Sequence, residues 1–191
     1  MEDGSLQKSL KWLGGLSNGI ISHELEALTL EGLQILHGQK GFIRCNFVVP
    51  SRVSDADGNW HVGAMATLID DVGAAAIYSV ADHVKASLDF DISFHSTAKI
   101  QEEVEIEAKV IGQKGKLTQV VVDVRRKGNG ELIALGKQWM ASNKDSMKAS
   151  QVDPMLHHHY QVLYIFERWI GWIFSGSKRN ETRGSCFPIP F

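Results

Sequence analysis

A continuous run of small and apolar residues, from Gly58 to Ala81, most constrains what this chain can fold into. The run is far longer than a typical strand and is opened by a short polar turn, which predicts one long buried helix. Its distinctive chemical feature is a pair of adjacent carboxylates, Asp70 and Asp71, set among small residues. A helix of this kind must be covered on several sides, so the rest of the fold is expected to be built around it.

The segments on both sides of this helix have the residue alternation of β-strands. Ahead of it, residues 33–37 and 42–49 predict a hairpin that Pro50 ends, because proline cannot donate to a ladder. After it, residues 88–94 alternate strictly between apolar and polar, which predicts a strand with one buried face. Three more strands in hairpin succession are predicted at residues 104–110, 120–124 and 132–140.

The chain divides into three parts by composition. Residues 1–29 hold leucines at helical spacing, which predict a short helix that Gly14-Gly15 ends and then a linker. Within this linker, residues 22–28 are either a helical turn or an irregular segment. Residues 30–146 predict an α+β domain in which an antiparallel β-sheet is wrapped around one long central helix. Residues 147–191 hold a histidine-rich linker, an aromatic segment and a proline-bearing end, and predict a poorly ordered tail. An amphipathic helix on a membrane surface, or docking on a partner, are the alternatives for this tail.

Charge and cysteine usage exclude several classes of function. The formal net charge is −2, with 20 basic and 22 acidic residues, which argues against a nucleic-acid partner. Cys45 and Cys186 lie far apart without metal-ligand spacing, and three consecutive histidines are too few for a metal site, so neither a metal nor a cofactor is expected. The acidic N-terminus is followed by no apolar segment, which predicts a protein of the cytoplasm or an organellar matrix that is not secreted.

Asp70 is the strongest candidate for chemistry in the central helix. Its neighbours three and four residues away are all small and include Gly73, so its side chain is expected to face a space. A glycine inside a helix costs about 1 kcal/mol relative to alanine, and it often marks a close approach by a backbone or ligand. One interpretation of Asp70 is a general base in a cleft; the other is an acid that faces solvent or is paired at a subunit interface. Asp71 is expected to have a structural role.

The entrance of the helix is the second candidate site. His61, Val62 and Gly63 precede and begin the first turn, where unpaired N–H groups and the helix dipole favour negative charge. A developing oxyanion could be held there without a charged side chain. The alternative for His61 is a role in capping the helix or packing at the turn.

The segment from His61 to Asp70 resembles the His-Gly-Gly-x-x-Ala-x-x-x-Asp signature of the hotdog-fold acyl-CoA thioesterases, in particular their phenylacetate-type branch. The resemblance continues through Ser87 and the alternating strand after it, and it covers residues 30–142. It implies a hotdog fold and hydrolysis of acyl-CoA to free coenzyme A and a carboxylic acid. It also implies a homodimer or homotetramer, with the cleft at the subunit interface.

The resemblance assigns roles to individual residues. Asp70 matches the acid that activates or positions the attacking water, and Ser87 matches the serine that holds this water. His61 and the N–H groups after it, in Val62 and Gly63, match the group that polarises the thioester carbonyl. Valine replaces the first glycine of the signature, and its stiff β-branched side chain is expected to crowd the carbonyl.

The loop ahead of the helix departs from the family as well. Asp55 stands where the family has a polar amide, and an ionised carboxylate cannot donate a hydrogen bond; Asn59 is the alternative donor. Lys85 and Lys99 are candidates for binding the phosphates of coenzyme A, unless they are solvated surface. These departures keep a second function open, a non-catalytic acyl-CoA-binding or partner-adaptor hotdog protein.

Overall fold

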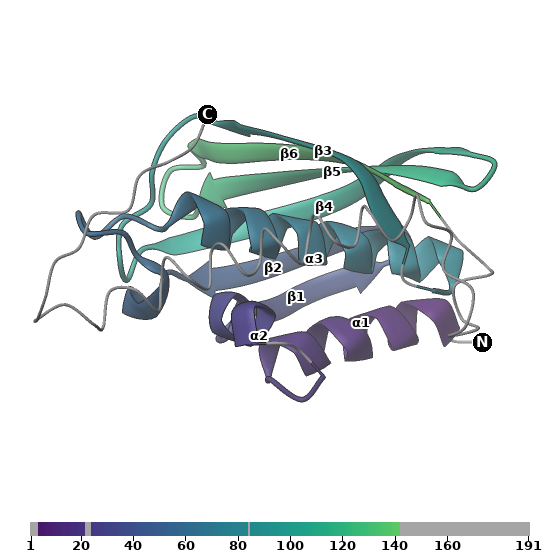
Figure 1. Ribbon diagram of the computed structural model, residues 1–191, viewed down its shortest axis with the longest axis horizontal. Coiled ribbons are helices and arrows are strands. Elements are labelled where there is room, and N and C mark those ends of the chain that lie inside the picture. Colours follow the sequence, from purple (N-terminus) through teal and green to yellow (C-terminus); the bar gives the residue numbers. More distant parts are fainter. Residues whose placement is uncertain (1–3, 22–23, 84, 142–191) are drawn as a thin grey trace, which may run out of the picture. The chain divides into compact units, whose positions relative to one another are not determined.

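A computed structural model describes residues 4–21, 24–83 and 85–141, so the predicted tail lies outside the described residues (Figure 1). The helices are α1 (Gly4–Ser17), α2 (Glu24–Leu30), the short 3-10 helix η1 (Ser51–Val53) and α3 (Val62–Ala81). The strands are β1 (Gln34–Gln39), β2 (Phe42–Val48), β3 (Ala86–Phe94), β4 (Glu103–Lys114), β5 (Leu117–Arg126) and β6 (Leu132–Ala141).

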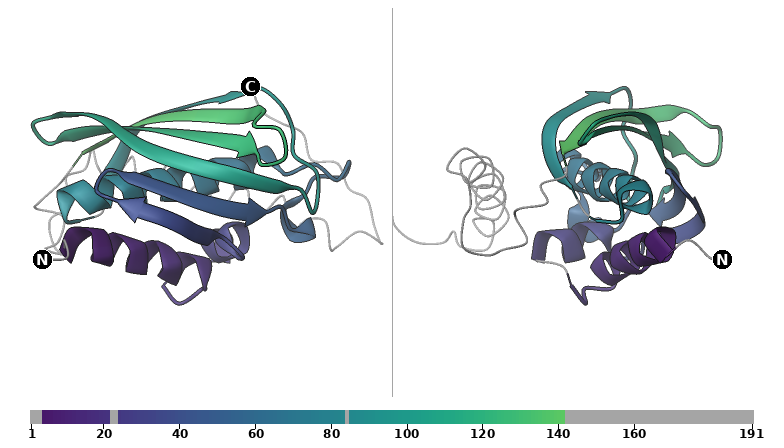
Figure 2. Two further views of the ribbon diagram at one scale, coloured as in Figure 1. Left: turned by 180° about the vertical axis from the view of Figure 1, so that it is seen from behind. Right: turned by 90° about the vertical axis from the view of Figure 1, so that its right-hand side faces the viewer.

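The six strands form one antiparallel sheet in the order β1-β2-β4-β5-β6-β3. The sheet curls around α3, and α1 and α2 pack on the side of α3 that the sheet leaves open (Figure 2). The length and apolar composition of α3 would suit a membrane span, but 67% of its most apolar window is buried inside the fold, as in a core helix. The predicted α+β class and the sheet around one long helix are confirmed.

The pairing of β3 differs from the predicted hairpin succession. β3 pairs with β6, with Ile92 opposite Gly136, and the chain then crosses from this edge of the sheet to β4 in its interior. The prediction was wrong because alternation in a sequence indicates which residues share a face, and carries no information on which strand lies alongside.

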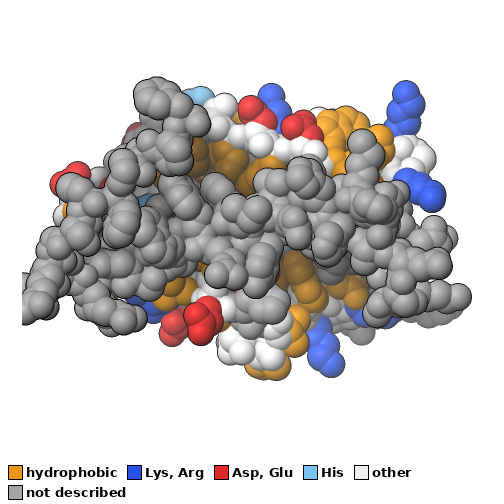
Figure 3. All heavy atoms as spheres, viewed as in Figure 1, with side chains coloured by type: hydrophobic (Ala, Val, Ile, Leu, Met, Phe, Trp, Pro, Cys, Tyr) orange, Lys and Arg blue, Asp and Glu red, His pale blue; other side chains and the backbone are white. Residues whose placement is uncertain are grey.

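The predicted buried face of β3 is also wrong within this chain. Leu88, Phe90 and Phe94 are 43%, 37% and 46% exposed. β3 is an edge strand, and a bulge between Ser87 and Asp89 interrupts its register with β6. Ile92 packs against the core, whereas Leu88, Phe90 and Phe94 form an exposed apolar edge. Figure 3 shows further hydrophobic side chains among charged ones.

The N-terminal segment forms two helices, so the predicted first helix is present but longer, and the helical alternative holds for residues 24–28. Gly14-Gly15 does not end α1, which continues to Ser17, and residues 24–30 form α2. Tertiary contacts hold α1 against α3: Ser5 Oγ donates to the Ser79 carbonyl at 2.7 Å, and Ser9 Oγ donates to the Ala75 carbonyl at 2.5 Å. Such contacts outweigh the weak helix propensity of two glycines.

Gly136 lets β6 pack tightly on α3. A Cβ added at this position would lie 2.5 Å from Cγ2 of Ile69. We expect Gly136→Ala to destabilise the fold by about 1–3 kcal/mol through overpacking, which in thermal unfolding is a loss of about 2–4 °C per kcal/mol. Gly128→Ala is the matched control, because nothing lies within 4 Å of a Cβ there. Equal melting temperatures for the two variants would contradict the close approach.

Candidate active site

Three polar side chains meet where α3 faces β3 and β6, and we call them the Asp70 cluster: Asp70, Ser87 and Gln138. Asp70 Oδ1 accepts hydrogen bonds from Ser87 Oγ at 3.1 Å and from Gln138 Nε2. Gln138 Nε2 also donates to Ser87 Oγ at 2.8 Å. The small residues around Asp70 on α3 leave the room for this contact, as the sequence indicated.

The two oxygens of the Asp70 carboxylate have different surroundings. Oδ1 is tied to Ser87 and Gln138, whereas no hydrogen bond from the described residues reaches Oδ2. Asp70 is half-buried, so its side chain is not enclosed completely. The arrangement fixes the carboxylate through one oxygen and leaves the other for a water or ligand.

The surroundings also change the acidity of Asp70. Burial raises the pKa of its carboxyl group above the ordinary value, and repulsion by Glu26 of α2 acts in the same direction. The hydrogen bonds from Gln138 and Ser87 oppose this rise by stabilising the ionised form. A raised pKa brings a carboxylate closer to the operating pH, where a general base works best.

The entrance of α3 is organised by its cap. His61 has extended backbone angles, φ −64° and ψ 129°, and its Nδ1 accepts from the backbone N–H of Gly63 at 3.1 Å. The capping interpretation of His61 is therefore confirmed. The cap occupies the N–H of Gly63, which is one of the two N–H groups expected to hold an oxyanion. The N–H of Val62 makes no hydrogen bond to the described residues, and the Val62 side chain is 54% exposed.

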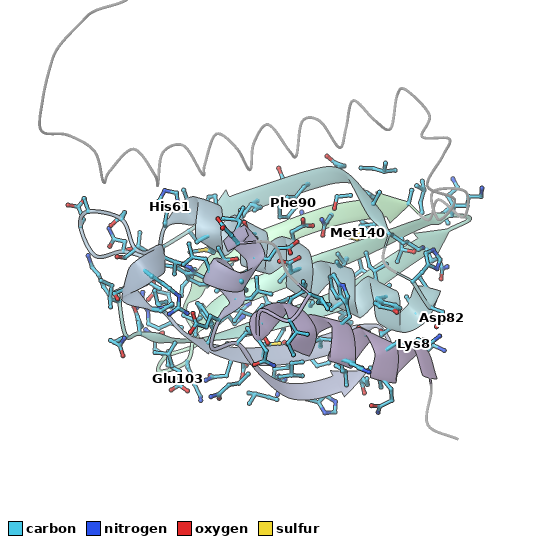
Figure 4. The ribbon with its side chains drawn as sticks, turned by 60° about the horizontal axis from the view of Figure 1, so that its bottom comes forward. Lys8, His61, Asp82, Phe90, Glu103 and Met140 are labelled. Carbon is cyan, nitrogen blue, oxygen red and sulfur yellow. The ribbon has the colours of Figure 1, made fainter. Side chains whose placement is uncertain are left out.

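The helix entrance and Asp70 do not meet within one chain. His61 lies at one end of α3 and Asp82 at the other (Figure 4). Asp82 forms an ion pair with Lys8 of α1. Val62 and Asp70 are eight residues apart on α3, which is about 12 Å at 1.5 Å per residue. A thioester carbonyl placed beside Asp70 is thus too far from the Val62 N–H of the same chain to accept a hydrogen bond from it.

The loop ahead of α3 uses its polar groups internally. Asp55 accepts from the backbone N–H groups of Asp57 and Asn59 at 2.9 and 2.8 Å, and from Asn59 Nδ2 at 3.1 Å. The hydrogen bonds from Asn59 hold the pKa of Asp55 below its usual range. One hydrogen of the Asn59 amide is therefore bound to Asp55, and a donor role for the second hydrogen stays a prediction.

The two candidate lysines differ in their surroundings. Lys85 is only 7% exposed; its Nζ donates to Thr118 Oγ1 at 2.6 Å and to the Lys116 carbonyl at 3.3 Å, and burial lowers its pKa. It is therefore not presented to a phosphate, because its ammonium group reaches into the β4–β5 turn. Lys99 is exposed, with Nζ 3.4 Å from the Asp57 carbonyl, and it remains a candidate.

Gln138 is the site residue that sequence reasoning missed. The buried positions of β6 alternate through Ala134, Gly136, Gln138 and Met140, so an amide stands in an otherwise apolar series. A polar residue at an inward-facing position of β6 was the sequence signal that could have identified Gln138.

Asp71, next to Asp70 on α3, is buried. No cluster of three metal-ligating side chains occurs in the described part of the chain.

Comparison with known proteins identifies relatives over the same region. A sequence model of the Thioesterase superfamily matches residues 57–133. Human acyl-coenzyme A thioesterase 13 is 30% identical over 106 residues, which cover 55% of this chain and 76% of the relative. The crystal structure of zebra fish thioesterase superfamily member 2 superposes with a TM-score of 0.65 and 27% identity, over 71% of this chain and 97% of that chain. A Streptococcus pneumoniae hypothetical thioesterase crystallised with coenzyme A has a TM-score of 0.55 and 19% identity, over 58% and 88% of the two chains.

Proposed function

This chain belongs to the thioesterase superfamily, and we propose that it hydrolyses acyl-CoA thioesters to free coenzyme A and a carboxylic acid. The observation that carries the proposal is the Asp70 carboxylate, which is held through Oδ1 and has Oδ2 available for a water. The name of the human relative and the coenzyme A in the pneumococcal structure support this class of substrate.

The Asp70 cluster and the N–H at the entrance of α3 together supply what thioester hydrolysis needs. Asp70 Oδ2 takes a proton from a water, whose oxygen attacks the thioester carbon. The carbonyl oxygen becomes an oxyanion, which accepts a hydrogen bond from the Val62 N–H at a helix N-terminus. The tetrahedral intermediate then expels the thiolate of coenzyme A, and the proton held by Asp70 passes to that sulfur. One water is consumed, and an acid and a thiol are released.

We propose further that a complete site needs two copies of this chain. The separation of about 12 Å between Val62 and Asp70 along one helix requires the oxyanion donor to come from a second copy. The exposed apolar edge formed by Leu88, Phe90 and Phe94 supports self-association, because an unpaired apolar edge strand is a template for another chain. A homodimer is the smallest such assembly; pairing of dimers into a homotetramer stays a prediction.

A second candidate function is acyl-CoA binding without turnover. It is favoured by Val62, whose exposed β-branched side chain stands beside the proposed oxyanion donor, where the family signature has glycine. Release of free thiol from a panel of acyl-CoAs of different chain length separates the two functions. We expect release that rises with enzyme concentration; saturable binding of acyl-CoA without thiol release would instead establish the binding protein.

A further inference from the structure

We propose that Gln138 is a positioning residue for this hydrolysis: its amide decides which oxygen of Asp70 and which lone pair of Ser87 remain for the attacking water. The inference rests on the proposed function. It concerns a residue that does not touch the substrate, and it is carried by the hydrogen bonds of one buried amide.

Both amide hydrogens of Gln138 are committed to the Asp70 cluster. The Gln138 side chain is 1% exposed, and its Nε2 donates to Asp70 Oδ1 and to Ser87 Oγ. An amide nitrogen has two hydrogens, so neither is left over. Ser87 then directs its single hydroxyl hydrogen to Asp70 Oδ1, and one lone pair of Ser87 Oγ remains free to accept a hydrogen from water.

The orientation of this amide has a cost that packing alone does not explain. Gln138 Oε1 is buried and has no hydrogen-bond partner among the described residues. A buried acceptor without a partner costs about 1–3 kcal/mol. The opposite orientation would bring Oε1 against the carboxylate of Asp70, two acceptors face to face. The chain thus leaves one amide oxygen unsatisfied in order to aim both hydrogens at the cluster.

A glycine in α3 makes the space for Gln138. A Cβ at Gly73 would lie 3.0 Å from Gln138 Oε1, with Val122 Cγ2 and Val120 Cγ1 at 3.2 and 3.3 Å. Glycine inside a helix costs about 1 kcal/mol relative to alanine. The close approach that this mid-helix glycine suggested is therefore made by Gln138 together with Val122 and Val120. The helix glycine and the unsatisfied Oε1 are two separate costs of placing Gln138 here.

The amide affects the charge of Asp70 as well as its position. Donation from Gln138 to Asp70 Oδ1 favours the ionised carboxylate and lowers its pKa, and Ser87 from β3 acts in the same direction. Glu26 of α2 is the charged group that opposes them, by repulsion. Loss of the Gln138 donor therefore raises the pKa of the base, and the form that accepts a proton from water appears at higher pH.

The test compares Gln138→Met with Gln119→Met in the full chain. Gln119 lies on β5 opposite Trp139, on the other face of the sheet from Gln138, so the same substitution there leaves the cluster untouched. For Gln138→Met we expect kcat to fall about 10- to 100-fold, as for other misplaced catalytic groups, with little change in KM and an acid limb of the kcat–pH profile at higher pH. Gln119→Met should match the wild type in all three.

Gln138→Glu keeps the shape of the side chain and adds a second carboxyl group beside Asp70. Its acid limb should move to higher pH by more than that of Gln138→Met, because a like charge adds to the lost donor. If Gln138→Met does not fold, this variant decides. An acid limb at the wild-type position with wild-type kcat in every folded Gln138 variant would overturn the inference.

A carboxyl titration makes the inference separable from the proposed function. The ¹³C NMR titration of the Asp70 carboxyl group should shift to higher pH in both Gln138 variants, whether or not acyl-CoA is hydrolysed; an unchanged titration would overturn the positioning role. Failure of the proposed function would look different: equal thiol release by wild type and Asp70→Asn, with the NMR shift intact.

Discussion

Replacing Asp70 with asparagine is expected to lower kcat for acyl-CoA hydrolysis by about 10²- to 10⁴-fold, the usual contribution of a positioned general base. An asparagine oxygen can still accept from Ser87 and Gln138, so the change removes the base and leaves its contacts in place. Release of free thiol under saturating substrate measures the loss. Asp71→Asn, the same change one residue along α3, is the matched control and should retain the wild-type rate.

The Asp70→Asn variant should also be more stable than the wild type at neutral pH. Burial raises the pKa of Asp70, so the folded state disfavours the ionised form. The stability linked to a raised carboxyl pKa is fully present below the unfolded value and is lost as pH rises through the folded value. Asparagine escapes that loss, so Tm of Asp70→Asn should exceed that of the wild type at pH 7 and approach it toward pH 4. Equal Tm differences at both pH values would contradict the burial of this charge.

Val62→Pro should lower kcat by about 10²- to 10³-fold, as the loss of one oxyanion donor does elsewhere. Proline is tolerated at the first position of a helix, and the extended angles of His61 suit a residue that precedes proline. The substitution therefore removes one backbone N–H and keeps the helix. Val62→Gly retains this N–H and is the control. A Val62→Pro enzyme as fast as Val62→Gly would rule out the Val62 N–H as the oxyanion donor.

Two inactive variants should restore activity when they are mixed. If each site takes Asp70 from one copy and Val62 from the other, a mixed dimer of Asp70→Asn and Val62→Pro has one intact site. Random exchange of equal amounts should then recover about a quarter of the wild-type rate. The measurement is thiol release after the two proteins are unfolded and refolded together. A rate that stays at the mean of the two separate variants would place both groups in one subunit.

Several features followed from local sequence alone. The small residues and length of the 58–81 segment determined that it would be a buried helix, because no other element can bury so many apolar side chains without a partner strand. Alternation along residues 104–110 and 132–140 predicted two strands, because successive side chains of a strand point to opposite faces. The roles of His61, Asp70 and Ser87 came from the resemblance to the thioesterase signature, and Asp70 does meet Ser87.

Only the tertiary structure decided which distant groups complete or leave the site. Gln138 meets Asp70 because α3 packs against β6, and it meets Ser87 because β6 pairs with β3. Neither neighbour is indicated by the alternation within β6. Lys85 is not part of the candidate phosphate site, because its ammonium group donates a hydrogen bond to Thr118 of β5. The period of a sequence determines which face a residue occupies, whereas hydrogen-bond partners depend on which elements the whole fold brings together.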